Sequence, residues 1–150
     1  MPKVIVLYTS LTGNTEEMAE AIAEGAREAG AETVCKEAFD AKPEELLKYD
    51  GIIIGAYTWG DGELPDEFLD FYAEMDDISL SGKKAAVFGS GDTSYPIYCG
   101  AVDIIEAKLR ELGAEISCES LKFEYNASNE EKEQGKRIGG LIAGLLSVAG

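Results

Sequence analysis

Residues 3–24 read KVIVLYTSLTGNTEEMAEAIAE, an apolar run followed directly by a segment rich in alanine and glutamate. The apolar run predicts a buried strand, and the segment after it has the spacing of an amphipathic helix. Between them, residues 10–15 read SLTGNT and contain no lysine or arginine. A helix that begins at such a turn presents free backbone N–H groups and the positive end of its dipole. The turn therefore predicts an anion-binding site that relies on hydrogen-bond donors.

The same alternation of strand and helix recurs along the chain. Apolar segments at 4–7, 33–35, 52–54, 85–88 and 116–123 predict five strands, and apolar stripes at 18–26, 68–75, 102–112 and 138–145 predict helices. The first, third and fourth strands are apolar throughout, which is typical of central parallel strands, while the second and fifth alternate and suit sheet edges. Right-handed crossovers then predict an α/β fold. We expect a doubly wound, five-stranded parallel sheet of order 2-1-3-4-5, with helices on both faces and residues 1–150 in a single domain.

Glycine and proline mark three boundaries in this arrangement. Gly30 and Gly113 each follow a predicted helix and are expected to adopt the left-handed conformation that ends helices. Pro43 is expected to open a short helix that runs to Leu47.

The charge balance excludes several classes of partner. The chain has 29 acidic and 13 basic residues, a formal net charge of −16 and no histidine. Nucleic-acid binding depends on Lys and Arg that neutralise phosphates, so the balance argues against it, and it disfavours anionic membranes as well. It favours partners with a basic patch. No apolar run reaches the ~18 residues of a membrane span, no signal peptide is recognisable, and three scattered cysteines indicate free thiols in a cytoplasmic protein.

Three loops after the first, third and fourth strands carry the chemistry. Ligands of such sheets bind beyond the carboxyl ends of the strands where the order reverses, here between strands one and three. The second loop reads YTWGDGELP at 57–65, and the third reads GSGDTSYPIYCG at 89–100. Trp59 and Tyr95 suit a planar ligand held between two rings. The alternatives are that Trp59 fills the core or covers the end of the sheet, and that Asn14 or Thr15 only caps a helix.

Other phosphate sites and catalytic centres do not fit. The sequence lacks GxxxxGK[ST], and the first turn lacks GxGxxG. There is no phosphatase-type Cys followed by Arg and no acidic cluster after the first strand. We find no nucleophile–base pair and no clustered metal ligands, so no catalytic residue and no metal are expected.

Taken together, SLTGNT at 10–15, TWGDG at 58–62 and GDTSY at 91–95 closely resemble the three FMN-binding loops of the flavodoxins. The resemblance spans the whole chain in order and spacing, and the fifth strand lacks a long insertion, as in the short-chain subgroup. Ser10 stands where Thr is more common, and Ser90 occupies a variable position. The resemblance implies non-covalent FMN held by the following residues: Ser10, Leu11, Thr12, Gly13, Asn14, Thr15, Thr58, Trp59, Gly60, Asp61, Ser90, Gly91, Asp92, Tyr95, Tyr98 and Cys99.

The resemblance also implies a function: a low-potential, one-electron carrier and not an enzyme. Asp61, Glu63 and Asp92 lie in loops that contain no cation, so we expect them to disfavour a reduced, anionic flavin. The expected partners are redox proteins with basic docking surfaces, and the expected state is a monomer. The alternatives are an FMN-dependent NAD(P)H:quinone reductase or nitroreductase of the same fold, and a plain anion- or nucleotide-binding module.

Overall fold

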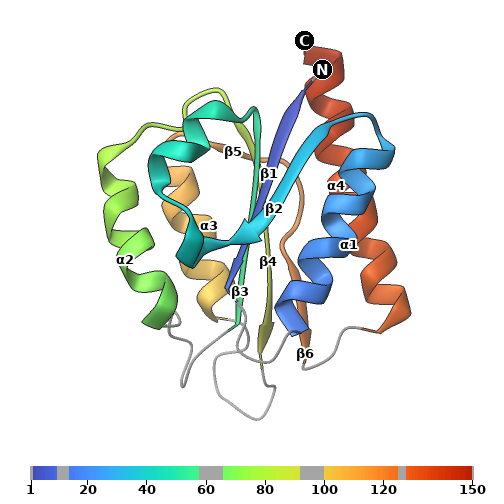
Figure 1. Cartoon of the computed structure of the whole chain (residues 1–150), viewed down its shortest axis with the longest axis horizontal. Helices are drawn as coiled ribbons and strands as arrows, with labels where there is room; N and C mark the ends of the chain where they lie inside the picture. Colours follow the sequence, from blue (N-terminus) through green and yellow to red (C-terminus); the bar gives the residue numbers. More distant parts are fainter. Residues whose placement is uncertain (1, 10–13, 58–65, 92–99, 125–127, 150) are drawn as a thin grey trace.

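The computed structural model describes residues 2–9, 14–57, 66–91, 100–124 and 128–149. Strands and helices alternate along these residues (Figure 1). The strands are β1 (Lys3–Thr9), β2 (Glu32–Glu37), β3 (Gly51–Tyr57), β4 (Lys84–Gly91), β5 (Glu115–Ile116) and β6 (Leu121–Glu124). The α-helices are α1 (Asn14–Glu28), α2 (Asp66–Glu74), α3 (Gly100–Glu111) and α4 (Asn129–Ala149), and the 3₁₀ helices are η1 (Ala38–Asp40), η2 (Pro43–Lys48) and η3 (Met75–Asp77).

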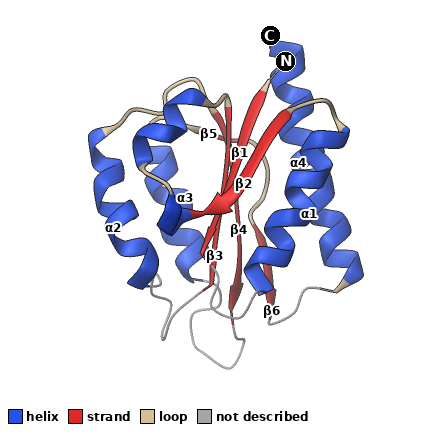
Figure 2. Ribbon diagram, in the orientation of Figure 1, coloured by secondary structure: helices blue, strands red, loops and turns tan. Residues whose placement is uncertain are grey.

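The strands form one parallel sheet of order β2-β1-β3-β4-β5, with β6 also paired to β4. Helices α2 and α3 cover one face and α1 and α4 the other (Figures 1 and 2). The predicted doubly wound fold and its strand order are therefore confirmed. Among the described residues, no helix has the length and hydropathy that a membrane span requires.

Two apolar clusters hold the layers together, one on each face of the sheet. Ile5 and Leu7 of β1 belong to the cluster with α2 and α3, whereas Val4 and Val6 belong to the cluster with α1 and α4. All four side chains are fully buried, because successive residues of a central strand point to opposite, covered faces.

The prediction of one continuous fifth strand over residues 116–123 is wrong, because the structure divides this segment into β5 and β6. Ile116 pairs with Ala85 and Leu121 pairs with Phe88, so residues 117–120 stand opposite only residues 86–87 of β4. The two extra residues form a bulge that separates β5 from β6. This segment lies at the sheet edge, where Ser120 donates to a Glu106 carboxylate oxygen at 2.6 Å. An edge strand with a bulge and polar side chains is a poor template for pairing with a further strand.

The expected boundaries are confirmed. Gly30 and Gly113 have φ values of 96° and 100°, the left-handed region in which glycine carries no steric penalty. Pro43 opens η2, a short 3₁₀ helix that ends at Lys48.

Glycines bring α1 and α4 into close contact. A Cβ added to Gly25 of α1 would lie 2.0 Å from the Lys136 carbonyl oxygen, and one added to Gly139 of α4 would lie 2.0 Å from that of Ile22. The absent side chains let the two backbones touch. An ion pair of 3.3 Å between Glu24 and Lys136 spans the same interface. The contact fixes α1, the helix that begins at the predicted anion site.

Candidate functional site

The strands and helices that flank the predicted site meet at one end of the sheet. Strands β1, β3 and β4 end there at Thr9, Tyr57 and Gly91, and α1 and α3 begin there at Asn14 and Gly100 (Figure 1). Strand β1 pairs with β2 on one side and β3 on the other, so the strand order reverses at this point as expected. The end of the sheet is therefore the position at which doubly wound folds bind ligands.

Four of the predicted site residues fall within the described part of the chain: Asn14, Thr15, Ser90 and Gly91. The others lie outside the described residues: Ser10, Leu11, Thr12, Gly13, Thr58, Trp59, Gly60, Asp61, Asp92, Tyr95, Tyr98 and Cys99. Glu63 lies outside them as well. Among the described four, the structure brings the Thr15 and Ser90 side chains into contact.

Thr15 and Ser90 form a hydroxyl pair between α1 and β4. Their Oγ1 and Oγ atoms are 3.3 Å apart, and either one is able to donate. The residues are 75 positions apart in the chain and are only 1% and 7% exposed. Two paired hydroxyls use one of their two protons, and no described residue accepts the second. The pair is thus able to offer a proton to a ligand oxygen.

Thr9 is a polar residue that the sequence analysis did not select. It is the last residue of β1 and is 5% exposed, and its Oγ1 has no hydrogen-bond partner among the described residues. Leaving a buried hydroxyl unpaired costs about 1–3 kcal/mol. Such a group requires an explanation in a folded protein. The available sequence signal was a threonine that directly follows the apolar run of β1 and Tyr8, at the reversal point.

These hydroxyls flank the end of the sheet on both faces. By strand alternation Thr9 follows Ile5 and Leu7 toward α2 and α3. Thr15 lies on α1, which covers the opposite face. A ligand that lies across the end of the sheet would meet donors from both sides.

Helix α3 packs closely against β4 at this end of the sheet. A Cβ added to Gly89 of β4 would lie 2.4 Å from the Ala56 carbonyl oxygen and 2.5 Å from Val102 Cγ2 of α3. The glycine therefore lets the first turn of α3 pack directly on the end of β4.

The donors that the described side chains supply around the reversal point are neutral hydroxyls. Burial, followed by the charge of Glu16, raises the pKa of Tyr8 to about 12, so its phenol stays a neutral donor up to high pH. Lys122 of β6, which pairs with β4 and lies away from the reversal point, is paired with Asp103 of α3 at 2.9 Å. An anion at this end would be stabilised by the α1 dipole and by hydroxyl protons. This donor set fits a phosphate group, and the described residues contain no cluster of metal ligands.

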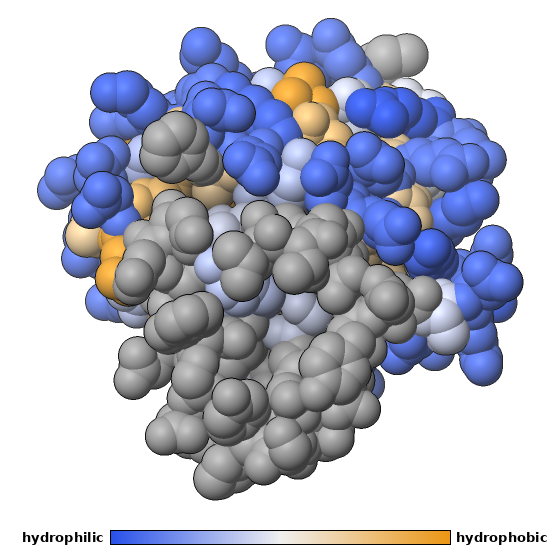
Figure 3. All heavy atoms as spheres, turned by 60° about the horizontal axis from the view of Figure 1, so that its bottom comes forward, coloured by the Kyte–Doolittle hydropathy of each residue, from blue (hydrophilic) through white to orange (hydrophobic). Residues whose placement is uncertain are grey.

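The described surface beside this end of the sheet is polar. Figure 3 turns the end toward the viewer, and the described side chains around it are mostly hydrophilic, with only small apolar patches. The exposed large apolar residues of the described chain are Leu47, Leu69, Leu141 and Leu145.

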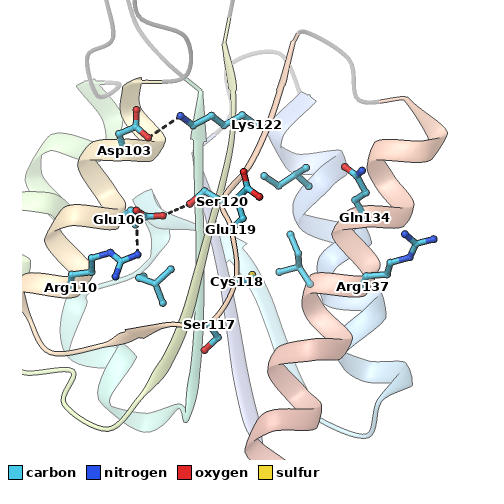
Figure 4. A pocket seen from close by; sticks show the side chains of 13 residues that line it. Asp103, Glu106, Arg110, Ser117, Cys118, Glu119, Ser120, Lys122, Gln134 and Arg137 are labelled. Atoms are coloured by element: carbon cyan, nitrogen blue, oxygen red, sulfur yellow. Dashed lines mark hydrogen bonds and ion pairs between the residues drawn. The ribbon is translucent and has the colours of Figure 1, made fainter.

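An open groove of about 880 Å³ lies elsewhere, along the edge of the sheet between α3 and α4 (Figure 4). Residues 117–120 line it, and Glu106 both accepts from Ser120 and pairs with Arg110 at 3.6 Å. Burial, followed by the charge of Glu106, raises the pKa of the Cys118 thiol, which disfavours a nucleophilic thiolate. The groove lies away from the strand ends and contains no catalytic constellation among the described residues.

Comparison with known proteins agrees with this architecture. A family model described as Flavodoxin matches residues 6–139. The chain is 50% identical over 135 residues to "Probable flavodoxin 2" of Bacillus subtilis. The aligned residues cover 89% of each of the two chains. It is 39% identical over 148 residues to the flavodoxin of Nitratidesulfovibrio vulgaris, covering 97% of this chain and 100% of that one.

A solved structure shows the same agreement in three dimensions. The crystal structure of oxidised Flavodoxin 1 from Bacillus cereus has a TM-score of 0.91 and 48% identity, covering 95% of this chain and 97% of that one. The chain belongs to the flavodoxin family, whose members bind FMN and carry electrons between redox partners.

Proposed function

We propose that this protein is a low-potential, one-electron carrier and that residues 1–150 form a single domain that holds FMN non-covalently. The supporting observation is the start of α1, a helix of 15 residues, beside the buried Thr15–Ser90 hydroxyl pair where the strand order reverses. Donors without positive charge suit the phosphate of a cofactor that must be held firmly at a fixed position.

Each of the three loops contacts a different part of the cofactor. The SLTGNT turn at 10–15 and the start of α1 hold the phosphate, and Trp59 and Tyr95 flank the flavin ring. Backbone groups near Gly91 and Asp92 face the pyrimidine edge of the ring. The remaining residues of the proposed site are Leu11, Thr58, Gly60, Asp61, Ser90, Tyr98 and Cys99. When bound, FMN supplies the group that accepts and releases electrons.

The acidic side chains of the loops lower the reduction potential for the second electron. Asp61, Glu63 and Asp92 place negative charges in loops that contain no lysine or arginine. One unit charge ~10 Å away at an effective dielectric of ~20 costs a new negative charge ~1.7 kcal/mol, or ~70 mV for one electron. We expect replacement of all three by Asn or Gln to raise the potential of the second electron by tens of millivolts. An unchanged potential in a spectroelectrochemical titration would exclude this contribution.

The negative charge of the whole chain indicates which class of partner it binds. A net charge of −16 favours redox proteins that present a basic docking surface. Association with such a partner should slow as ionic strength rises, because screening weakens steering between opposite charges. A monomer in the cytoplasm fits this role, and the free thiols of Cys35 and Cys118 suit a reducing compartment.

The test is the visible spectrum of the purified chain, followed by stepwise anaerobic reduction. We expect one FMN per chain, released on denaturation, and reduction in two separate one-electron steps. A colourless chain that takes up no FMN would overturn the proposal in favour of a plain anion-binding module. Rapid oxidation of NAD(P)H by the flavin-loaded protein with a quinone or nitro compound would overturn it in favour of a reductase.

A further inference from the structure

Packing within the described chain does not explain the hydroxyl of Thr9. The residue is 5% exposed and its Oγ1 has no partner among the described residues, and a buried hydroxyl left unpaired weakens a fold. Valine has nearly the same shape and the same preference for strands, without the polar atom. A hydroxyl at this position therefore points to a partner that the described residues do not supply.

The position of Thr9 identifies where that partner would come from. Thr9 is the last residue of β1 and pairs with Ala56 of β3, directly at the reversal of strand order. It immediately precedes the SLTGNT turn, and strand alternation from Leu7 directs its side chain to the face of the sheet opposite α1. The Thr15–Ser90 pair lies at the same end from the α1 side. A ligand across this end is the group best placed to reach all three hydroxyls.

We propose that the Thr9 hydroxyl obtains its hydrogen-bond acceptor from bound FMN, as a donor to an oxygen of the phosphorylated ribityl tail. This inference rests on the proposed FMN site and adds to it a residue outside the three loop motifs. The hydroxyl then has opposite effects in the two forms of the protein. It weakens the flavin-free chain, in which it is unpaired, and strengthens flavin binding, in which it is paired.

The test compares two substitutions of Thr9 with a matched control. Thr9→Val removes the hydroxyl and keeps the shape, whereas Thr9→Ser keeps the hydroxyl. Thr33→Val is the control, because the Thr33 hydroxyl of β2 already donates to the Ala31 carbonyl oxygen at 3.2 Å. Each full-length variant is freed of flavin, titrated with FMN by fluorescence quenching, and unfolded by heat in the flavin-free form.

We expect Thr9→Val to weaken FMN binding about tenfold, which corresponds to about 1.4 kcal/mol. The midpoint of unfolding of its flavin-free form should rise by about 2–4 °C, because the unpaired hydroxyl is gone. Thr9→Ser should keep the FMN dissociation constant within about twofold of the wild type. Thr33→Val should leave FMN affinity unchanged and should not raise the midpoint. A parallel titration with riboflavin identifies the acceptor: a loss with FMN alone assigns it to the phosphate, and a loss with both flavins assigns it to the ribityl chain.

Two results would overturn the inference. One is an FMN affinity of Thr9→Val equal to that of the wild type. The other is a lower midpoint for its flavin-free form, which would mean that a buried water or a protein group already pairs the hydroxyl. If Thr9→Val does not fold, Thr9→Ala provides the same comparison, since it introduces no new bulk. Failure of the wild-type chain to bind FMN would instead overturn the proposed function.

Discussion

The contact between α1 and α4 allows a prediction about the helix that begins at the proposed cofactor site. A Cβ added to Gly139 would lie 2.0 Å from the Ile22 carbonyl oxygen, 2.8 Å from the Ala26 nitrogen and 3.0 Å from the Ile22 carbonyl carbon. All three atoms belong to the backbone, so no side chain is able to rotate away. Gly144 lies on the same helix, but a Cβ added there would meet nothing within 4 Å. The two glycines therefore form a matched pair for substitution by alanine.

The expected effects of the two substitutions differ in sign. A carbon–oxygen contact is about 3.3 Å, so Gly139→Ala must separate the helices by about 1.3 Å. We take the upper end of overpacking costs, about 3 kcal/mol, because the obstacle is backbone. Replacing glycine by alanine inside a helix stabilises the helix by about 1 kcal/mol. The net loss in the free energy of unfolding is therefore about 2 kcal/mol. For a chain of this length the midpoint of unfolding should fall by about 6 °C. Gly144→Ala should gain the same helix stabilisation without a steric cost, so its midpoint of unfolding should rise by about 3 °C.

Thermal and urea unfolding of the flavin-free chain measure both effects. Flavin must be absent, because a ligand that binds only the folded state adds its own stabilisation by mass action. If Gly139→Ala is as stable as the wild type, or gains as much as Gly144→Ala, the backbone contact between α1 and α4 is refuted.

Three further predictions concern the strands and surface that support the site. A Cβ added to Gly55 would lie 2.2 Å from the ring of Phe88, which is fully buried, so Gly55→Ala should cost about 1–3 kcal/mol. Adding Phe88→Leu should recover part of that loss in urea unfolding, and strict additivity would argue against the contact. The pKa of Tyr8 is raised from 10.0 to about 12, so the unfolded chain ionises first and stability should fall as pH rises between these values. Tyr8→Phe should have a flatter alkaline stability profile than the wild type, and two identical profiles would contradict this. The hydrogen bond from Lys36 lowers the pKa of Glu45, so its contribution is present above the unfolded pKa and is lost as pH falls through the folded one. The stability difference between wild type and Glu45→Gln should therefore shrink in acid, and a difference that persists there would count against the pairing.

The sequence predicted the elements whose signals are local. Continuous apolar runs marked the central strands because both of their faces are buried, as the full burial of Ile52 and Ile53 confirms. Gly30 and Gly113 marked helix ends because their left-handed φ values are strained for other residues.

Features that depend on tertiary contacts were not predicted. The segment 116–123 alternates apolar and polar residues except at Glu119 and Ser120, so the two extra residues of the bulge are identified only by the pairing with β4. Gly25 and Gly139 have only a low helix propensity as a sequence signal, and their role follows from the approach of two backbones. Thr9 was passed over for the same reason, because an unpaired hydroxyl is recognised only when its surroundings are known.

The candidate site divides in a similar way. The position of the predicted anion-binding turn followed from the strand order, and the structure adds the contact between Thr15 and Ser90. The roles of Trp59 and Tyr95 stay predictions, because both residues lie outside the described part of the chain.

The central claim is that neutral donors at the start of α1 hold the phosphate of FMN. The most direct test is a fluorescence titration of the flavin-free chain with FMN and with riboflavin, which lacks the phosphate, at equal salt concentration. Two hydrogen bonds to a charged group at about 1.5 kcal/mol each predict that FMN binds at least about 100-fold more tightly. Equal dissociation constants for the two flavins would contradict the account.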